Sequence, residues 1–255
     1  GSFAMMNYEP PVMATDLLIS SRTPENKIDM ALEMMDVNSM DTGRYRAMVV
    51  QDPEDRQNIT GFVRFAHVLS ARGVEFGSGG INTYLIDNFT DALNEFTGLK
   101  ADYEGYITID DVRLLEIPIV FSVGGATNES ENEMMARYLL AGGFVVGHIN
   151  FEGLAKYGGL VEGRDFWRER LPDDHLIYSA FFDIGGGAPS SMTQSGSGKQ
   201  SIDSWNQAFG YYVKGRLAGI TFGWWAHHPR SPRGQQLVSN IVVYALTQEG
   251  SMTQR

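Results

Sequence analysis

The chain of 255 residues contains no cysteine. This absence excludes disulfide bonds, metal sites built from thiolates and catalysis by a cysteine nucleophile. It also favours a periplasmic or secreted location, where a protein benefits from having no stray thiols, with the cytoplasm as the alternative.

The sequence also lacks a run of about 18 apolar residues, so we expect no direct membrane insertion. Positive charge is scarce, because 20 Lys and Arg stand against 31 Asp and Glu and leave a net charge of −11. The basic residues form no stripe, which argues against nucleic acid and anionic membranes as partners. The hydrophobic content of 43% still provides for a sizeable core.

Composition divides the chain into three parts. Residues 1–5 (GSFAM) have the appearance of a cloning scar. Residues 6–57 form an N-terminal extension with a Met-rich helix at Lys27–Asp36, whose stripe could pack internally or meet a protein partner or a second copy. Residues 58–255 alternate between strand and helix patterns and predict an α/β domain.

The segment Ile117–Gly153 has the clearest pattern. It predicts a buried strand, a glycine loop, a capped helix, a Gly-Gly stop and a second buried strand. Such a unit places two parallel strands in one sheet, with their carboxyl ends around a shared crevice. The features are Ile117–Val123, Gly124-Gly125, a capping box at Asn128/Glu131 or Ser130/Glu133, Gly142-Gly143 and Phe144–Gly147.

The remaining patterns extend this unit into a three-layer, mostly parallel sheet with helices on both faces, plus an N-terminal helix and hairpin extension. The expected strands are Gly43–Val50, Ile59–Val68, Tyr106–Ile109 and Arg216–Gly223. The first two could pair as a hairpin, or the second could begin the main sheet. The expected helices are Ile81–Phe96, Phe166–Leu171 and one from Ser231-Pro232 through Leu246, and Gly185–Gly198 is expected to be a long loop.

Two sets of motifs resemble known families. Ile117–Gly153 resembles the trehalose-utilisation-like branch of the class I glutamine amidotransferase-like fold, with its acidic-capped helix, Ala-Gly-Gly stop and Gly147-His148 turn. The motifs LPDDHLIYSAFFDIG, GRLAGITF and NIVVYALT are similar to the bacterial family called domain of unknown function 4159. The resemblance covers roughly residues 59–248 and implies a glutamine amidotransferase-like, flavodoxin-like fold. The family itself implies no established activity.

The chain departs from the family pattern in two places. Members often carry T-G-H-G after the central strand, where this chain has Ser122-Val123-Gly124-Gly125. They also often carry acids where this chain has His148-Ile149-Asn150. A ligand held by those family residues would have no matching group here.

The turn that carries the nucleophile in true amidotransferases offers His148 and Asn150, but neither Ser nor Cys. Because G-x-S-x-G is also missing from that turn, an acyl-enzyme mechanism is not expected. Gly124 and Gly125 could present backbone N–H groups to an anion, or serve only a tight strand-to-helix turn. His148, at the end of its strand, could bind a metal, act as a base or hydrogen-bond a sugar hydroxyl.

The aromatic segment Trp224-Trp225 with His227 follows the last expected strand. It could stack on a sugar, cover the sheet edge or contact another subunit. Gly124, Gly125, His148, Asn150, Trp224, Trp225 and His227 are therefore the predicted ligand-binding residues.

The sequence favours a non-catalytic ligand-binding or assembly domain of a bacterial cell-envelope system. A small molecule or carbohydrate is the expected ligand, and no cofactor or resident metal is expected. The alternative is a carbohydrate-active hydrolase or isomerase in which His148 acts with Asp174 or His175, with or without a metal.

Overall fold

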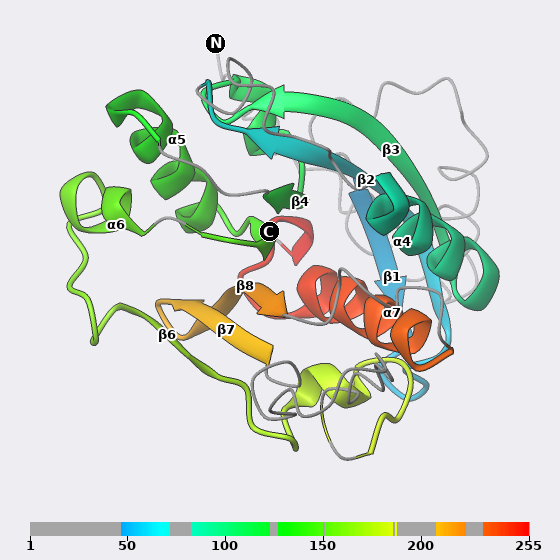
Figure 1. Cartoon of the computed structure of the whole chain (residues 1–255). Helices are drawn as coiled ribbons and strands as arrows, with labels where there is room; N and C mark the ends of the chain where they lie inside the picture. The colour runs from blue at the N-terminus through cyan, green and yellow to red at the C-terminus, as the bar shows by residue number, and fades with distance from the viewer. Residues whose placement is uncertain are drawn as a thin grey trace, which may run out of the picture. The chain divides into compact units, whose positions relative to one another are not determined.

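A mixed β-sheet flanked by helices organises the part of the chain that the structure describes (Figure 1). The structure is a computed structural model, and it describes residues 47–71, 83–122, 127–149, 151–185, 187, 208–222 and 232–254. Contacts divide the chain into two compact units, Gly1–Asp41 and Thr42–Arg255. All described residues belong to the second unit.

Eight strands make up the sheet within the described residues. They are β1 (Ala47–Gln51), β2 (Ile59–Leu69), β3 (Gly98–Thr108), β4 (Ile119–Ser122), β5 (Phe144–Gly147), β6 (Phe166–Arg170), β7 (Ala208–Val213) and β8 (Arg216–Phe222). The α-helices are α4 (Thr83–Phe96), α5 (Glu129–Leu140), α6 (Glu152–Lys156) and α7 (Pro232–Thr247). Short 3₁₀ helices are η1 (Val112–Glu116), η2 (Leu176–Ser179) and η5 (Met252–Gln254).

Five strands, in the spatial order β3-β2-β4-β5-β8, run parallel to their neighbours. β7 and β6 extend this sheet beyond β8 by antiparallel pairing. β1 pairs antiparallel with the first half of β2, from Ile59 to Val63, and β4 pairs with the second half, from Phe65 to Val68. The predicted parallel pairing of the strands before and after α5 is therefore confirmed.

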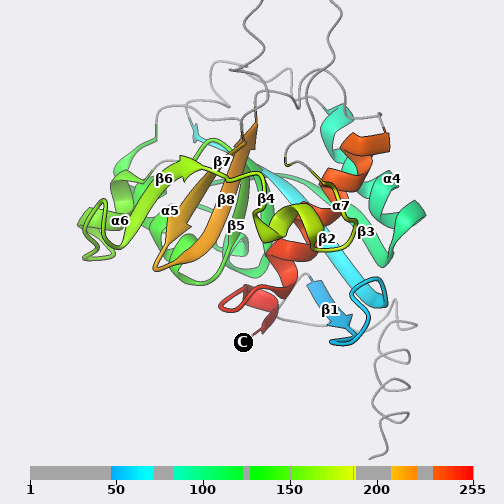
Figure 2. The same ribbon diagram turned by 90° about the horizontal axis from the view of Figure 1, so that it is seen from below.

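Helices pack against both faces of the sheet. Successive side chains of a strand point to opposite faces, so neighbouring residues join different core clusters. On β2, Phe65 joins a core cluster with residues of α4 and α7, whereas Ala66 joins a cluster with residues of α5 and α6. Figures 1 and 2 both show α4 beside α7 and α5 beside α6. No helix among the described residues is long and apolar enough to span a bilayer.

The end of α5 shows why the Gly-Gly stop is needed. Tyr138 is fully buried, and its hydroxyl lies within hydrogen-bond distance of the Pro118 and Phe144 carbonyl oxygens at 3.1 and 3.0 Å. A Cβ atom at Gly143 would lie 2.3 Å from the Tyr138 ring. The glycine therefore makes room for the ring that joins the end of α5 to the start of β5.

Some predictions for the described residues were wrong. Phe166–Leu171 was expected to be a helix, but Phe166–Arg170 is strand β6, which is stabilised by pairing with β7. β7 itself was not predicted, and the short strand expected at Tyr106 is the end of the long β3. The hairpin alternative for β1 and β2 is confirmed, and β2 also pairs with the parallel strands.

Other predictions fall outside the described residues. These are the helix Lys27–Asp36, the cap Ser231 and most of the loop Gly185–Gly198.

Candidate functional site

Three parallel strands, β2, β4 and β5, end at the same edge of the sheet. Val68 pairs with Ser122, and Ser122 pairs with Gly147, so the three strands end within one residue of the same level. In open α/β sheets, ligands bind in the crevice outside the carboxyl ends of the strands. This carboxyl edge is therefore the candidate site.

His148 is the one predicted ligand-binding residue that lies within the described part of the chain, and it is exposed directly after β5. Gly147 turns the chain there with a φ of +121°, and a Cβ at this position would lie 2.2 Å from the Ser122 carbonyl oxygen. A glycine is thus required where the chain leaves β5. The other predicted residues, Gly124, Gly125, Asn150, Trp224, Trp225 and His227, lie outside the described residues.

His175, the proposed assistant of His148, has a structural role. Its Nδ1 accepts a hydrogen bond from the Ile177 N–H at 3.1 Å and caps η2. Its Nε2 lies 3.3 Å from the Tyr212 hydroxyl oxygen. Burial of the imidazole lowers the pKa of His175 below its ordinary value.

The register places His175 near the amino ends of the parallel strands, whereas His148 lies at their carboxyl ends. Tyr212, the partner of His175, pairs with Leu217 near the start of β8. Because Gly219 pairs with Val145, Leu217 lies level with the residue before β5, roughly 16 Å along the strand direction from His148. Asp174 is exposed beside His175, so the structure does not bring either residue to His148.

A buried carboxylate joins the exits of β2 and β4. Glu131 in the first turn of α5 is 1% exposed, and its Oε1 accepts a hydrogen bond from the Ala71 N–H at 2.5 Å. Its Oε2 accepts from the Asn128 N–H at 2.8 Å, and the Asn128 side chain accepts from the Glu131 N–H at 2.9 Å. The predicted Asn128/Glu131 capping box is therefore confirmed, and it also fixes the chain that follows β2.

A second histidine at this edge was missed by sequence reasoning. His67 lies near the end of β2, is 3% exposed, and pairs with Tyr106 of β3 and Phe121 of β4. Its Nδ1 lies 3.1 Å from the Tyr103 hydroxyl oxygen. Its ring stacks on Tyr106 with centroids 5.3 Å apart and an interplanar angle of 16°.

A β-bulge brings the two tyrosines to the same side of β3. The register between β2 and β3 shifts between Phe65 and His67, and Gly105 in the bulge has a φ of +100°. The extra residue changes the alternation of side chains, so Tyr103 and Tyr106 both contact His67. We call His67, Tyr103 and Tyr106 the imidazole–tyrosine cluster.

Two members of the imidazole–tyrosine cluster, His67 and Tyr103, carry no charge near neutral pH. Burial lowers the pKa of His67 to about 4. Burial and a hydrogen bond with the Tyr106 side chain raise the pKa of Tyr103 well above its usual range. Neither group exchanges its proton readily at pH 7, so the arrangement suits hydrogen bonding better than general acid–base catalysis.

A local signal for His67 is a polar residue near the carboxyl end of a mostly apolar strand. Its partners follow 36 or more residues later along the chain, and spacing alone could not pair them. The described residues include no group of three or more His, Cys, Asp or Glu side chains placed to hold a metal ion.

Comparison with known families matches the chain to "Domain of unknown function (DUF4159)" over residues 74–246. The chain belongs to this family. The matched segment begins between β2 and α4 and ends in the last turn of α7, so it includes β4, β5, His148 and the tyrosines of the cluster. His67 precedes it. The comparison with curated proteins gave no match.

Proposed function

We propose that the chain is a non-catalytic ligand-binding domain of a bacterial cell-envelope system, with its ligand at the carboxyl ends of β2, β4 and β5. The order of the strands is the main support. From β2 the chain moves outward to β3 and then returns to the other side of β2 as β4. In sheets of this kind, such a reversal of direction is where a ligand-binding crevice lies, outside the carboxyl ends of the strands.

The same strand order supports the proposed fold type. Numbered along the chain, the parallel strands β3-β2-β4-β5-β8 follow the order 2-1-3-4-5, which is that of flavodoxin-like sheets. We therefore propose a three-layer, flavodoxin-like arrangement of the glutamine amidotransferase-like type. The nucleophile of the amidotransferases is absent, because the chain has no cysteine.

Two observations support binding rather than catalysis. His148 is exposed, and its proposed assistants Asp174 and His175 lie toward the other edge of the sheet. His67, the buried histidine at the carboxyl edge, has a pKa of about 4, so its imidazole is neutral at pH 7. The alternative of a carbohydrate-active hydrolase or isomerase using His148 with Asp174 or His175 therefore has less support.

Ligand screening by thermal unfolding tests the proposed site. Neutral sugars, nucleosides and divalent metals would each be added to the unmodified protein, the His148→Ala variant and the Asp174→Ala variant. A ligand at 100 times its Kd should stabilise the native protein by about 2.7 kcal/mol. His148→Ala should reduce this stabilisation, whereas Asp174→Ala, a change of an exposed residue toward the opposite edge, should leave it unchanged.

Two results would contradict the proposal. Equal stabilisation of the His148→Ala variant and the unmodified protein would remove His148 from the site. Conversion of the stabilising compound to a product by the unmodified protein would show an enzyme. For the location, fractionation of cells that express the native gene should place the protein in the cell envelope, and recovery from the cytoplasm would refute that part.

A further inference from the structure

The imidazole–tyrosine cluster lies at the same edge as the proposed site. His67 pairs with Tyr106 on one side and with Phe121 on the other, and Phe121 pairs with Val146. His148 follows two residues after Val146, or roughly 7 Å further along the strand direction. One ligand of moderate size could therefore span from β3 to β5, since neighbouring strands are about 4.8 Å apart.

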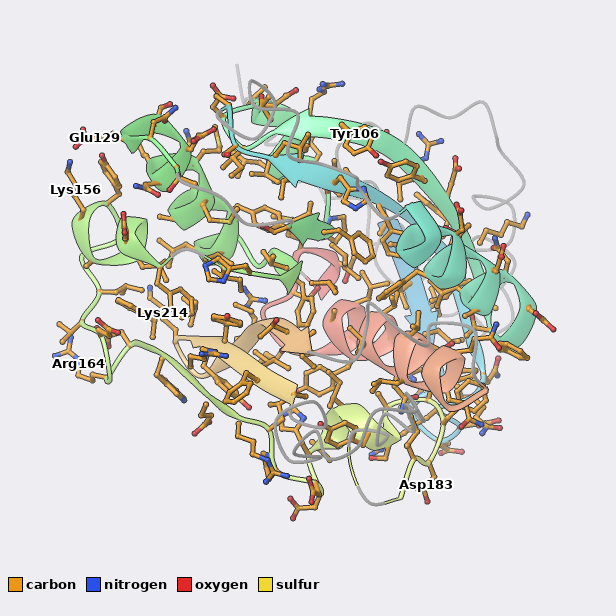
Figure 3. The ribbon with its side chains drawn as sticks, in the orientation of Figure 1. Tyr106, Glu129, Lys156, Arg164, Asp183 and Lys214 are labelled. Atoms are coloured by element: carbon orange, nitrogen blue, oxygen red, sulfur yellow. The ribbon has the colours of Figure 1, made fainter. Side chains whose placement is uncertain are left out.

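Tyr106 presents an aromatic surface in this region. The residue is 45% exposed although its ring stacks on His67, and the Tyr103 ring meets it edge-on at a centroid distance of 6.1 Å. Contacts from two rings hold Tyr106 in place, so little side-chain entropy remains to be lost on binding. Figure 3 shows Tyr106 on β3, well apart from the ion pair of Glu129 and Lys156.

The cluster also holds an unused hydrogen-bonding atom. His67 Nδ1 contacts the Tyr103 hydroxyl, and Nε2 has no hydrogen-bond partner among the described residues. A ligand hydroxyl that reaches Nε2 would give this atom a hydrogen bond. Because the ring is neutral, Nε2 can bond to a neutral donor or acceptor.

The surrounding charges limit the class of ligand. Asp87 acts electrostatically on Tyr103, whereas Arg64, which is paired with Glu104 at 3.6 Å, shares the opposite face of β2 with Ala66. An anion would meet negative charge here and find no unpaired cation among these residues. The net charge of −11 acts in the same direction.

We infer that the imidazole–tyrosine cluster is a subsite for a neutral sugar ring, which stacks on Tyr106 and hydrogen-bonds to His67. A pyranose has an apolar face for the tyrosine ring and hydroxyl groups for the imidazole nitrogen. This inference rests on the proposed function, because it names the ligand class for the same carboxyl edge. His67 and Tyr106 contact the ligand, and Tyr103 is a positioning residue that holds His67.

The test measures binding of neutral sugars by calorimetry and NMR. The probes are glucose, galactose, mannose, N-acetylglucosamine and their disaccharides, with adenosine as a flat aromatic probe and tetramethylammonium as a cationic probe. Tyr106→Leu should weaken sugar binding at least about tenfold, which corresponds to 1.4 kcal/mol. Tyr106→Phe keeps the ring and should bind within about threefold of the unmodified protein.

Matched variants separate the site from general effects on the fold. Tyr157, which follows α6 against the other face of the sheet, is also a partly exposed tyrosine at 37%, so Tyr157→Leu should leave sugar binding unchanged. His67→Phe should bind sugar about tenfold more weakly while Tyr106 remains. Tyr103→Phe should change the NMR shifts of the His67 ring nitrogens, a signature that a role in packing alone would not produce.

Each outcome decides between the two proposals. Sugar binding that His148→Ala weakens and Tyr106→Leu leaves intact would overturn this inference and keep the proposed function. Sugar binding that Tyr106→Leu abolishes and His148→Ala leaves intact would confirm the subsite and show that His148 is not part of the ligand site. Binding of adenosine or tetramethylammonium in place of sugars, or no sugar binding at millimolar concentrations, would overturn the sugar assignment.

Discussion

Mild acid should destabilise the fold through His67. Burial lowers the pKa of this imidazole from 6.5 to about 4. The unfolded chain takes up a proton near pH 6.5, whereas the folded protein does so only near pH 4. His67 therefore contributes stability above pH 6.5, and this contribution is lost as the pH falls toward 4.

The size of the effect follows from the two pKa values. A difference of one pKa unit corresponds to 1.36 kcal/mol, so the shift from 6.5 to about 4 sets an upper limit of about 3 kcal/mol. Only part of this stability is lost by pH 5. The unfolded chain is almost fully protonated there, but the loss continues until the folded protein is itself protonated near pH 4. The linkage relation gives a loss of about 2 kcal/mol between pH 7 and pH 5.

Urea unfolding at pH 7, 6 and 5 measures this loss. His67→Phe is the matched variant, because it keeps an aromatic ring against Tyr106 and leaves every other titratable group, including His175, in place. The unmodified protein should lose about 2 kcal/mol more than the variant between pH 7 and pH 5. Parallel losses in the two proteins would refute the reasoning. Should the variant fail to fold, NMR titration of the unmodified protein decides, since a His67 ring that protonates above pH 6 is incompatible with the burial argument.

Two further predictions concern the framework around the site. Glu131→Ala removes the acceptor for two backbone N–H groups and should cost about 3 kcal/mol in urea unfolding, whereas Glu133→Ala, an exposed acid of the same helix, should change stability by less than about 0.5 kcal/mol. Equal effects of the two changes would show that the hydrogen bonds of Glu131 to the Ala71 and Asn128 N–H groups do not stabilise the fold. Gly143→Ala places a methyl group 2.3 Å from the Tyr138 ring and should lower stability by about 2 kcal/mol, while Gly185→Ala, with open space around its Cβ position, should have little effect on calorimetric Tm.

Elements that depend on adjacent residues could be predicted from the sequence. Strand β5 begins at Phe144 as expected, and α5 begins at the capping box formed by Asn128 and Glu131. A cap is a hydrogen bond between residues three positions apart, so its signal lies in a short stretch of sequence. The Gly-Gly stop after α5 is equally local.

Strand β6 could not be predicted because its stability comes from distant residues. The five residues of β6 include one buried position, Phe166, so their hydrophobic pattern does not distinguish a strand from a helix. The strand forms because β7, about 40 residues later, pairs with it and Tyr212 stacks on Trp167 at 5.1 Å. The polar residues of β6 face outward at this edge of the sheet, and they match an exposed helix as well as an edge strand.

The imidazole–tyrosine cluster depends on a still less visible feature, the bulge at Gly105. In a regular strand, residues 103 and 106 point to opposite faces, so Tyr106 would leave His67 and turn toward the α5 side. The extra residue at the positive φ of Gly105 reverses that alternation, which is why Leu99 and Ala101 join one core cluster and Ile107 joins the other. A single glycine thus decides whether the imidazole–tyrosine cluster exists, although nothing beside it in the sequence indicates that role. In folds of this kind, bulges on the strands around the point where the strand order reverses are therefore the places to search for binding residues that motif spacing does not reveal.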